Sequence, residues 1–136
     1  MKKEDNVDLI CNIGELTAIF EKSSHLDEFL QNVVEMIANH MRASVCSIYL
    51  YNEQKTALVL SATFGLNPES VGKVVLKIGE GLAGKALKEL RSIREDIGPS
   101  NPNFKYIPET GEEKYQAFLA VPVLRGHSRL GVIVLQ

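Results

Sequence analysis

The spacing of apolar residues changes along the chain near residue 43, and this change limits the possible folds more than any other feature. Before it, apolar residues recur at helical spacing. One stripe predicts a helix over residues 7–21 and consists of Leu9, Ile13, Leu16 and Phe20. A denser stripe predicts a second helix over residues 26–41. After residue 43 the apolar residues come in short extended runs, so we expect an α+β fold.

The extended runs at the two ends of this second region predict hairpins. Residues 45–51 and 57–64 are rich in Val, Ile, Leu and Tyr and are separated by the turn residues 52–55. Residues 116–124 and 129–135 form a similar pair. Because hairpins join neighbouring strands in opposite directions, the sheet is expected to be mainly antiparallel.

The middle of the chain is mixed. It predicts an extended run over 71–78, a short helix over 82–90 and a short strand over 92–96, followed by a loop rich in Gly, Pro and Asn. The first two helices are expected to cover one face of the sheet, and residues 79–122 the other. This arrangement gives a sheet with helices on both faces.

Length and composition restrict the class of protein. A chain of 136 residues, 45% hydrophobic and 24% charged, is expected to form one domain with a real core. The net charge of −2 and the scattered basic residues give no support to a nucleic-acid partner. No signal peptide or membrane-length apolar run is present, so we expect a cytoplasmic protein with no membrane partner. Cys11 and Cys46 are then expected to be free thiols.

The chain ends at Gln136 inside a strand-like run. A domain rarely ends in the middle of a strand, so residues 1–136 are expected to be a single domain from a longer protein, truncated at its C-terminus.

Residues 79–84 match the glycine pattern G-x-G-x-x-G of dinucleotide-binding loops. The pattern follows an extended run and opens a helix, as such loops do. The surrounding elements do not fit, because a dinucleotide fold needs a longer crossover helix and further parallel strands. We therefore favour a structural interpretation, in which the glycines permit a tight turn and close packing.

No catalytic or metal-binding constellation is evident. His25, His40 and His127 do not have the spacing of metal ligands. No nucleophile elbow occurs. The chain itself is therefore expected to be no enzyme and to need no cofactor.

Aromatic residues are concentrated in one polar segment near the C-terminal hairpin, and they are Phe104, Tyr106, Tyr115 and Phe118. Aromatic walls with a few polar groups are typical of small-molecule pockets. The same rings could instead pin a long loop onto the sheet, and both roles can hold together. Arg94, Asp96 and Lys105 are the charged residues that we expect to be best placed near this segment.

Taken together, several segments resemble a GAF domain, from Leu9 to the end of the chain. The resemblance is carried by the second helix and by residues 43–50 (ASVCSIYL), 62–66 (ATFGL), 78–84 (IGEGLAG), 118–123 (FLAVPV) and 131–135 (GVIVL). It implies a GAF-like, profilin/PAS-like antiparallel sheet with a helical layer on one face and a ligand pocket on the other.

Two of the segments point to one subfamily. Residues 45–50 and 104–113 resemble the N-terminal sensory domain of nitrogen-branch phosphoenolpyruvate–protein phosphotransferases. The resemblance implies a parent enzyme that passes phosphate from phosphoenolpyruvate through a histidine to an HPr-like phosphocarrier. Those catalytic parts would follow Gln136, so no histidine of this chain inherits the phosphorylated role.

The resemblance also implies a regulatory ligand, an amino acid such as glutamine or a related metabolite. By strand alternation Leu58, Leu60 and Ala62 are expected to share one face. Leu60 and Leu76 are predicted to floor the pocket, with Ile93 and Asp96 as a wall. The predicted lid is formed by Phe104, Tyr106, Tyr115 and Phe118. Asp96 would bind the ligand ammonium, and Arg94 or the helix start at residues 82–83 would bind its carboxylate.

The stripe of the first helix predicts a contact between two copies. Leu9, Ile13, Leu16 and Phe20 would be buried in a two-fold helical layer, giving a homodimer. The alternative function is a ligand-free dimerisation or interaction scaffold, and a nucleotide-dependent enzyme built on the glycine loop is a third. An enclosed pocket with converging polar groups would favour sensing over the scaffold.

Overall fold

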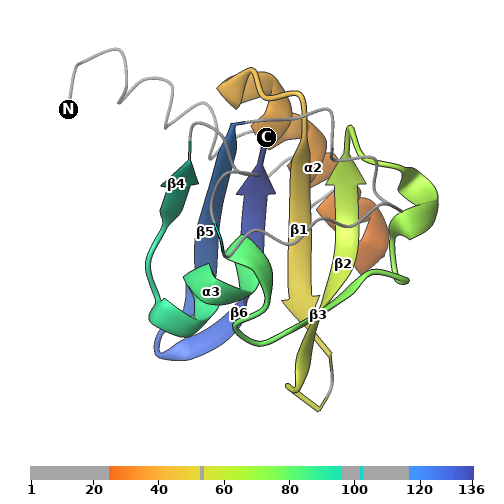
Figure 1. Cartoon of the computed structure of the whole chain (residues 1–136). Helices are drawn as coiled ribbons and strands as arrows, with labels where there is room; N and C mark the ends of the chain where they lie inside the picture. The colour runs from red at the N-terminus through yellow and green to blue at the C-terminus, as the bar shows by residue number, and fades with distance from the viewer. Residues whose placement is uncertain (1–24, 53, 96–101, 103–116) are drawn as a thin grey trace.

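The computed structural model describes residues 25–52, 54–95, 102 and 117–136. Along the chain, its elements are α2 (Leu26–Met41), β1 (Cys46–Tyr51), β2 (Ala57–Phe64), the 3-10 helix η1 (Pro68–Ser70), β3 (Val75–Lys77), α3 (Gly81–Glu89), β4 (Ile93–Glu95), β5 (Phe118–Arg125) and β6 (Ser128–Leu135) (Figure 1). The helix predicted over residues 7–21 lies outside the described residues.

The strands of the described residues form one six-stranded sheet in the order β3-β2-β1-β6-β5-β4. Every neighbouring pair is antiparallel. The two predicted hairpins, β1–β2 and β5–β6, are therefore confirmed, and they meet at the centre of the sheet through β1 and β6. This topology confirms the α+β fold with an antiparallel sheet.

Helix α2 covers one face of the sheet, over β1 and β2. Asp27 and Glu28 lie in its first turn, where acidic side chains interact favourably with the helix dipole. The helix ends at Arg42, which adopts the left-handed conformation (φ 52°) and donates its backbone N–H to the carbonyls of Ala38 and Asn39. The buried layer between the helix and the sheet contains Leu30, Val33, Val34, Ala38, Cys46, Ile48, Ala62 and Leu135.

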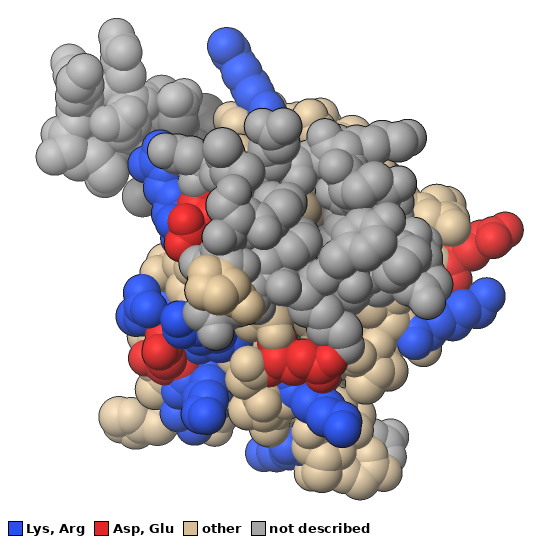
Figure 2. Space-filling view, in the orientation of Figure 1, with Lys and Arg blue, Asp and Glu red and all other residues tan. Residues whose placement is uncertain are grey.

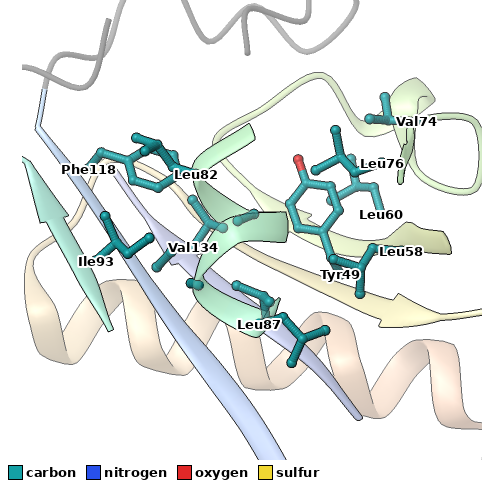
Figure 3. Close-up of a cluster of buried hydrophobic side chains, with 14 residues drawn as sticks. Tyr49, Leu58, Leu60, Val74, Leu76, Leu82, Leu87, Ile93, Phe118 and Val134 are labelled. Atoms are coloured by element: carbon teal, nitrogen blue, oxygen red, sulfur yellow. The ribbon is translucent and has the colours of Figure 1, made fainter. Parts of the chain in front are cut away.

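Helix α3 covers the opposite face and is only nine residues long. Its buried side chains are Leu82, Ala83, Ala86 and Leu87. They pack on side chains of β1, β2, β5 and β6 to form a second apolar layer (Figure 3). The core is thus divided into two layers by the sheet, one under each helix.

A β-bulge at Ser61 corrects one expectation. Ile48 pairs with Ala62 whereas Tyr49 pairs with Leu60, so β2 contains one extra residue at this point. Leu60 consequently packs under α3, and Ala62 packs under α2. The prediction that Leu58, Leu60 and Ala62 share a face is wrong at Ala62, because simple alternation does not continue through a bulge.

The extended run predicted over residues 71–78 is also mostly not a strand. Only Val75–Lys77 pairs with β2. The preceding residues form η1 and turns, and the side chain of Asn67 accepts a hydrogen bond from the N–H of Glu69 at 3.1 Å. Pro68 at the first helical position favours this helical turn.

Candidate functional site

Four of the predicted ligand-binding residues lie together under α3. Leu60, Leu76, Ile93 and Phe118 are 0%, 3%, 5% and 7% exposed and belong to one apolar layer. Figure 3 shows them around the side chains of α3, with the ring of Tyr49 between Leu58 and Leu76. The described part of the predicted pocket floor is therefore apolar and closely covered by the helix.

Of the other predicted ligand-binding residues, Arg94 alone is among the described residues. Asp96, Phe104, Tyr106 and Tyr115 lie outside the described residues, as do Leu9, Ile13, Leu16 and Phe20 of the predicted dimer contact. Arg94 is described, and it alternates with Ile93 along β4. Because its strand partner is Leu119, which packs in the α2 layer, Arg94 faces the α2 side of the sheet, away from Leu60.

A cavity of about 530 Å³ lies on the side that Arg94 faces. Its walls come from the end of α2 and the following loop, from β4, from the start of β5 and from the end of β6. It is open to solvent on one side. The lining residues are Met41, Arg42, Ala43, Ser44, Arg94, Glu95, Ala117, Phe118, Leu119, Leu135 and Gln136. We call it the α2-end cavity.

The polar side chains assigned to the α2-end cavity are two guanidinium groups and an amide. Arg42 and Arg94 supply hydrogen-bond donors in the planar geometry that suits a carboxylate. The side-chain nitrogen of Gln136 is buried and has no hydrogen-bond partner among the described residues. Since a buried donor without a partner is costly, this nitrogen is a further donor available to a ligand.

The backbone fixes these groups at one edge of the domain. Gln136 is held beside the loop after α2, because it exchanges two backbone hydrogen bonds with Val45, at 3.0 and 2.9 Å. Sequence reasoning singled out Arg94 but missed Arg42 and Gln136. Arg42 and Gln136 are far apart in the chain. The pairing of β1 with β6 places Gln136, which follows β6, beside the loop that joins α2 to β1.

The glycine motif has a packing role in the described structure. Gly79 and Gly81 have positive φ angles of 84° and 68°. A Cβ on Gly84 would lie 3.0 Å from both the nitrogen of Gly79 and the carbonyl oxygen of Lys77, so α3 approaches the preceding turn closely. The strand after α3 is β4, which pairs antiparallel with β5. This geometry differs from the parallel crossover of a dinucleotide fold.

Cys46 is not suited to nucleophilic chemistry. Its side chain is completely buried, and it is a free cysteine. Burial raises the pKa of the thiol from 9.0 to about 12. Because the thiolate is the reactive form, Cys46 is inert near neutral pH.

The fold and the sequence together define the class of protein. The GAF domain family model matches residues 23–136. The chain belongs to the GAF domain family, and its antiparallel sheet with helices on both faces is the GAF fold.

Individual proteins show which GAF domains this chain resembles. The chain is 34% identical to the GAF domain from a phosphoenolpyruvate-protein phosphotransferase of Coxiella burnetii, with a TM-score of 0.80 over 91% of this chain and 76% of that one. It is 32% identical over 117 residues to the phosphoenolpyruvate-dependent phosphotransferase system protein of Escherichia coli (strain K12), covering 86% of this chain. The nitrogen fixation protein VnfA of Azotobacter vinelandii is 28% identical over 136 residues, covering 96% of this chain.

The chain spans only a small part of these curated relatives, 16% of the Escherichia coli protein and 26% of VnfA. It is similar to the GAF domain of phosphotransferase proteins, which is a sensory or regulatory part. In the described residues, no helix has the length and apolar character needed to cross a membrane.

Proposed function

We propose that this GAF domain senses a small molecule and thereby regulates a phosphoenolpyruvate-dependent phosphotransferase in nitrogen signalling. The observation that carries the sensing role is the α2-end cavity, with two arginines and a buried amide donor on its walls. The likeness to a phosphotransferase GAF domain and to a nitrogen fixation protein supports the signalling context.

An α-amino acid such as glutamine is the first candidate ligand. It carries a carboxylate and an ammonium, and burying either without a partner is costly. Arg42 and Arg94 can pair with the carboxylate. Glu95 also borders the cavity, but its strand partner Phe118 packs under α3, so its carboxylate is not assigned to the ammonium. The apolar wall contains Met41, Leu119 and Leu135. A related 2-oxoacid would use the same arginines.

The α2-end cavity is a different placement from the pocket predicted on the α3 face. Loss of the response in an Arg94 variant would also distinguish binding in the cavity from binding elsewhere on the surface. The test is a thermal-shift titration with glutamine, followed by other amino acids, 2-oxoacids and nucleotides. A ligand at about 100 times its Kd adds roughly 2.7 kcal/mol to the free energy of unfolding. We expect Arg94→Ala and Arg42→Ala to weaken the response, each by about tenfold or more in Kd.

The matched control is Arg125→Ala, which removes an exposed arginine at the opposite end of β5. It should leave the response unchanged. Asp96→Ala tests the α3-face placement, since that placement requires Asp96 for the ammonium. If the arginine variants respond like the wild type while Asp96→Ala does not, the ligand lies on the α3 face. If no metabolite raises the melting temperature, sensing itself is rejected.

The second candidate function is a ligand-free interaction scaffold. Met41 is 58% exposed at the wall of the α2-end cavity, and the cavity opens to solvent. Such an apolar opening also suits a packed helix from a second copy, as in the homodimer predicted from the stripe at Leu9–Phe20. Sedimentation of the wild type and of Leu16→Asp tests this. A concentration-dependent dimer that the charge abolishes, together with no metabolite response, would favour the scaffold.

The phosphotransfer itself is assigned to the parent protein. We infer that the HPr-like phosphocarrier meets the parent enzyme and not this domain, since His25, His40 and His127 have no assigned role here. Incubation of the chain with labelled phosphoenolpyruvate and the carrier should then leave it unlabelled. Transfer of the label to a histidine of this chain would contradict that assignment.

A further inference from the structure

Three exposed leucines lie at the end of the domain opposite the α2-end cavity. Leu90 follows the last turn of α3, and Leu124 and Leu130 lie near the β5–β6 turn. Their exposed fractions are 47%, 46% and 40%. Figure 1 shows the end of α3 and the β5–β6 turn side by side. We call the surface formed by Leu90, Arg91, Leu124, Arg129 and Leu130 the α3–hairpin surface.

A hydrogen bond joins the two halves of this surface. The Nε of Arg129 donates to the carbonyl oxygen of Leu87 at 3.3 Å, three residues before Leu90. The same carbonyl also accepts the backbone N–H of Leu90 at 3.4 Å, so the hairpin and the helix end bond to one atom of the last helical turn. Leu124 pairs with Arg129 across the hairpin, so both side chains lie on the α3 side of the sheet. The surface is therefore presented on fixed elements.

The surface is basic. Arg91 and Arg129 belong to it, and Lys88 lies in the last turn of α3. The one carboxylate among residues 85–91 and 124–130 is Glu89, which already accepts from Arg91 at 2.8 Å. Figure 2 shows Lys and Arg side chains gathered at the lower left, where Figure 1 places α3 and the hairpin. Positive charges therefore outnumber negative charges around these leucines and can pair with carboxylates of a partner.

We propose that the α3–hairpin surface docks an acidic amphipathic helix of a protein partner. The leucines would contact the apolar face of that helix, and the arginines would pair with carboxylates at its edges. A lipid surface fits less well. The tip of the turn is Gly126–His127, which has no apolar side chain to insert, and each leucine is more than half covered by the domain.

The test uses the isotope-labelled chain and a synthetic probe. The probe is an amphipathic peptide of about 18 residues with Leu on one helical face and Glu on the other. We expect amide shift changes confined to residues 87–91 and 124–130. The same peptide with Lys in place of Glu, and one with Ser in place of Leu, should bind about tenfold more weakly or not at all.

Variants of the chain locate the binding. Arg91→Glu and Leu130→Ser should each weaken the acidic peptide about tenfold. Lys73→Glu is the matched control, because it reverses an exposed charge just before β3, the edge strand that lies three places from β6 in the sheet. Equal binding of the Lys peptide, shifts elsewhere in the domain, or no shift at about 1 mM peptide would overturn the proposal. So would binding to phosphatidylglycerol vesicles alone, or the same shifts appearing on self-association without peptide.

Discussion

The hydroxyl groups of Ser47 and Thr63 form a hydrogen bond inside the sheet, and their removal gives a sharp prediction. The two residues face each other across β1 and β2, with 2.8 Å between Oγ and Oγ1. Ser47 is fully buried and Thr63 is 5% exposed. Among the described residues each hydroxyl has the other as its partner, so deleting one leaves the other buried and unpaired.

The expected costs follow from this pairing. Ser47→Ala and Thr63→Val should each lower the free energy of unfolding by about 1–3 kcal/mol, because a polar group loses its only compensation. The double variant removes both hydroxyls and should cost less than the sum of the single variants, with a coupling of about 1 kcal/mol. Urea-induced unfolding followed by circular dichroism measures all four proteins under two-state conditions.

The control is Ser61→Ala, since the Ser61 hydroxyl donates only to a local carbonyl, that of Val59, at 3.0 Å on a half-buried site. It should cost less than either buried variant. If the double variant costs as much as the two single variants together, the hydroxyls act independently and the reasoning is refuted.

Three further predictions concern the core. Leu60→Ala should cost about 2–5 kcal/mol by the same unfolding assay, because Leu60 is fully buried under α3; a smaller loss would mean that the layer collapses around the change. Gly131→Ala should cost about 1–3 kcal/mol or prevent folding, because its Cβ would overlap the carbonyl oxygen of Tyr49; a neutral result would show that β1 and β6 can separate. Burial raises the pKa of Cys46 from 9.0 to about 12. The unfolded thiol loses its proton first, so stability is lost as the pH rises from 9.0 towards about 12, and Cys46→Ala should remove that part of the pH dependence.

Most of the fold could be predicted from periodicity and turn chemistry. The helix over residues 26–41 and both hairpins depend on local patterns that the tertiary structure leaves unchanged. The two errors have physical causes. Ser61 is an extra residue that nothing in the apolar pattern marks. The strand β3 is shortened because the N–H groups of Lys73 and Val74 donate to the carbonyl of Ser70, in a turn where Gly72 has a φ of 81°.

The candidate site was harder to predict, because it depends on neighbours that are distant in the chain. Arg94 was selected for its charge, but its direction depends on the pairing of β4 with β5. Gln136 and Arg42 become neighbours of Arg94 only through the order of strands in the sheet. Aromatic clustering directed attention to residues 104–118, most of which lie outside the described residues, and that prediction stays open.

The sheet has unequal strands, and this inequality affects how the domain behaves beside other chains. Its outermost strands, β3 and β4, are three residues each, whereas the inner strands have six to eight. An exposed strand edge can recruit a foreign strand in proportion to the hydrogen-bonding groups it offers. The short edge strands β3 and β4 offer few such groups, and Lys77 and Arg94 add charge to them. A domain of this kind can stand next to other folded units, at high local concentration, with little tendency to join their sheets.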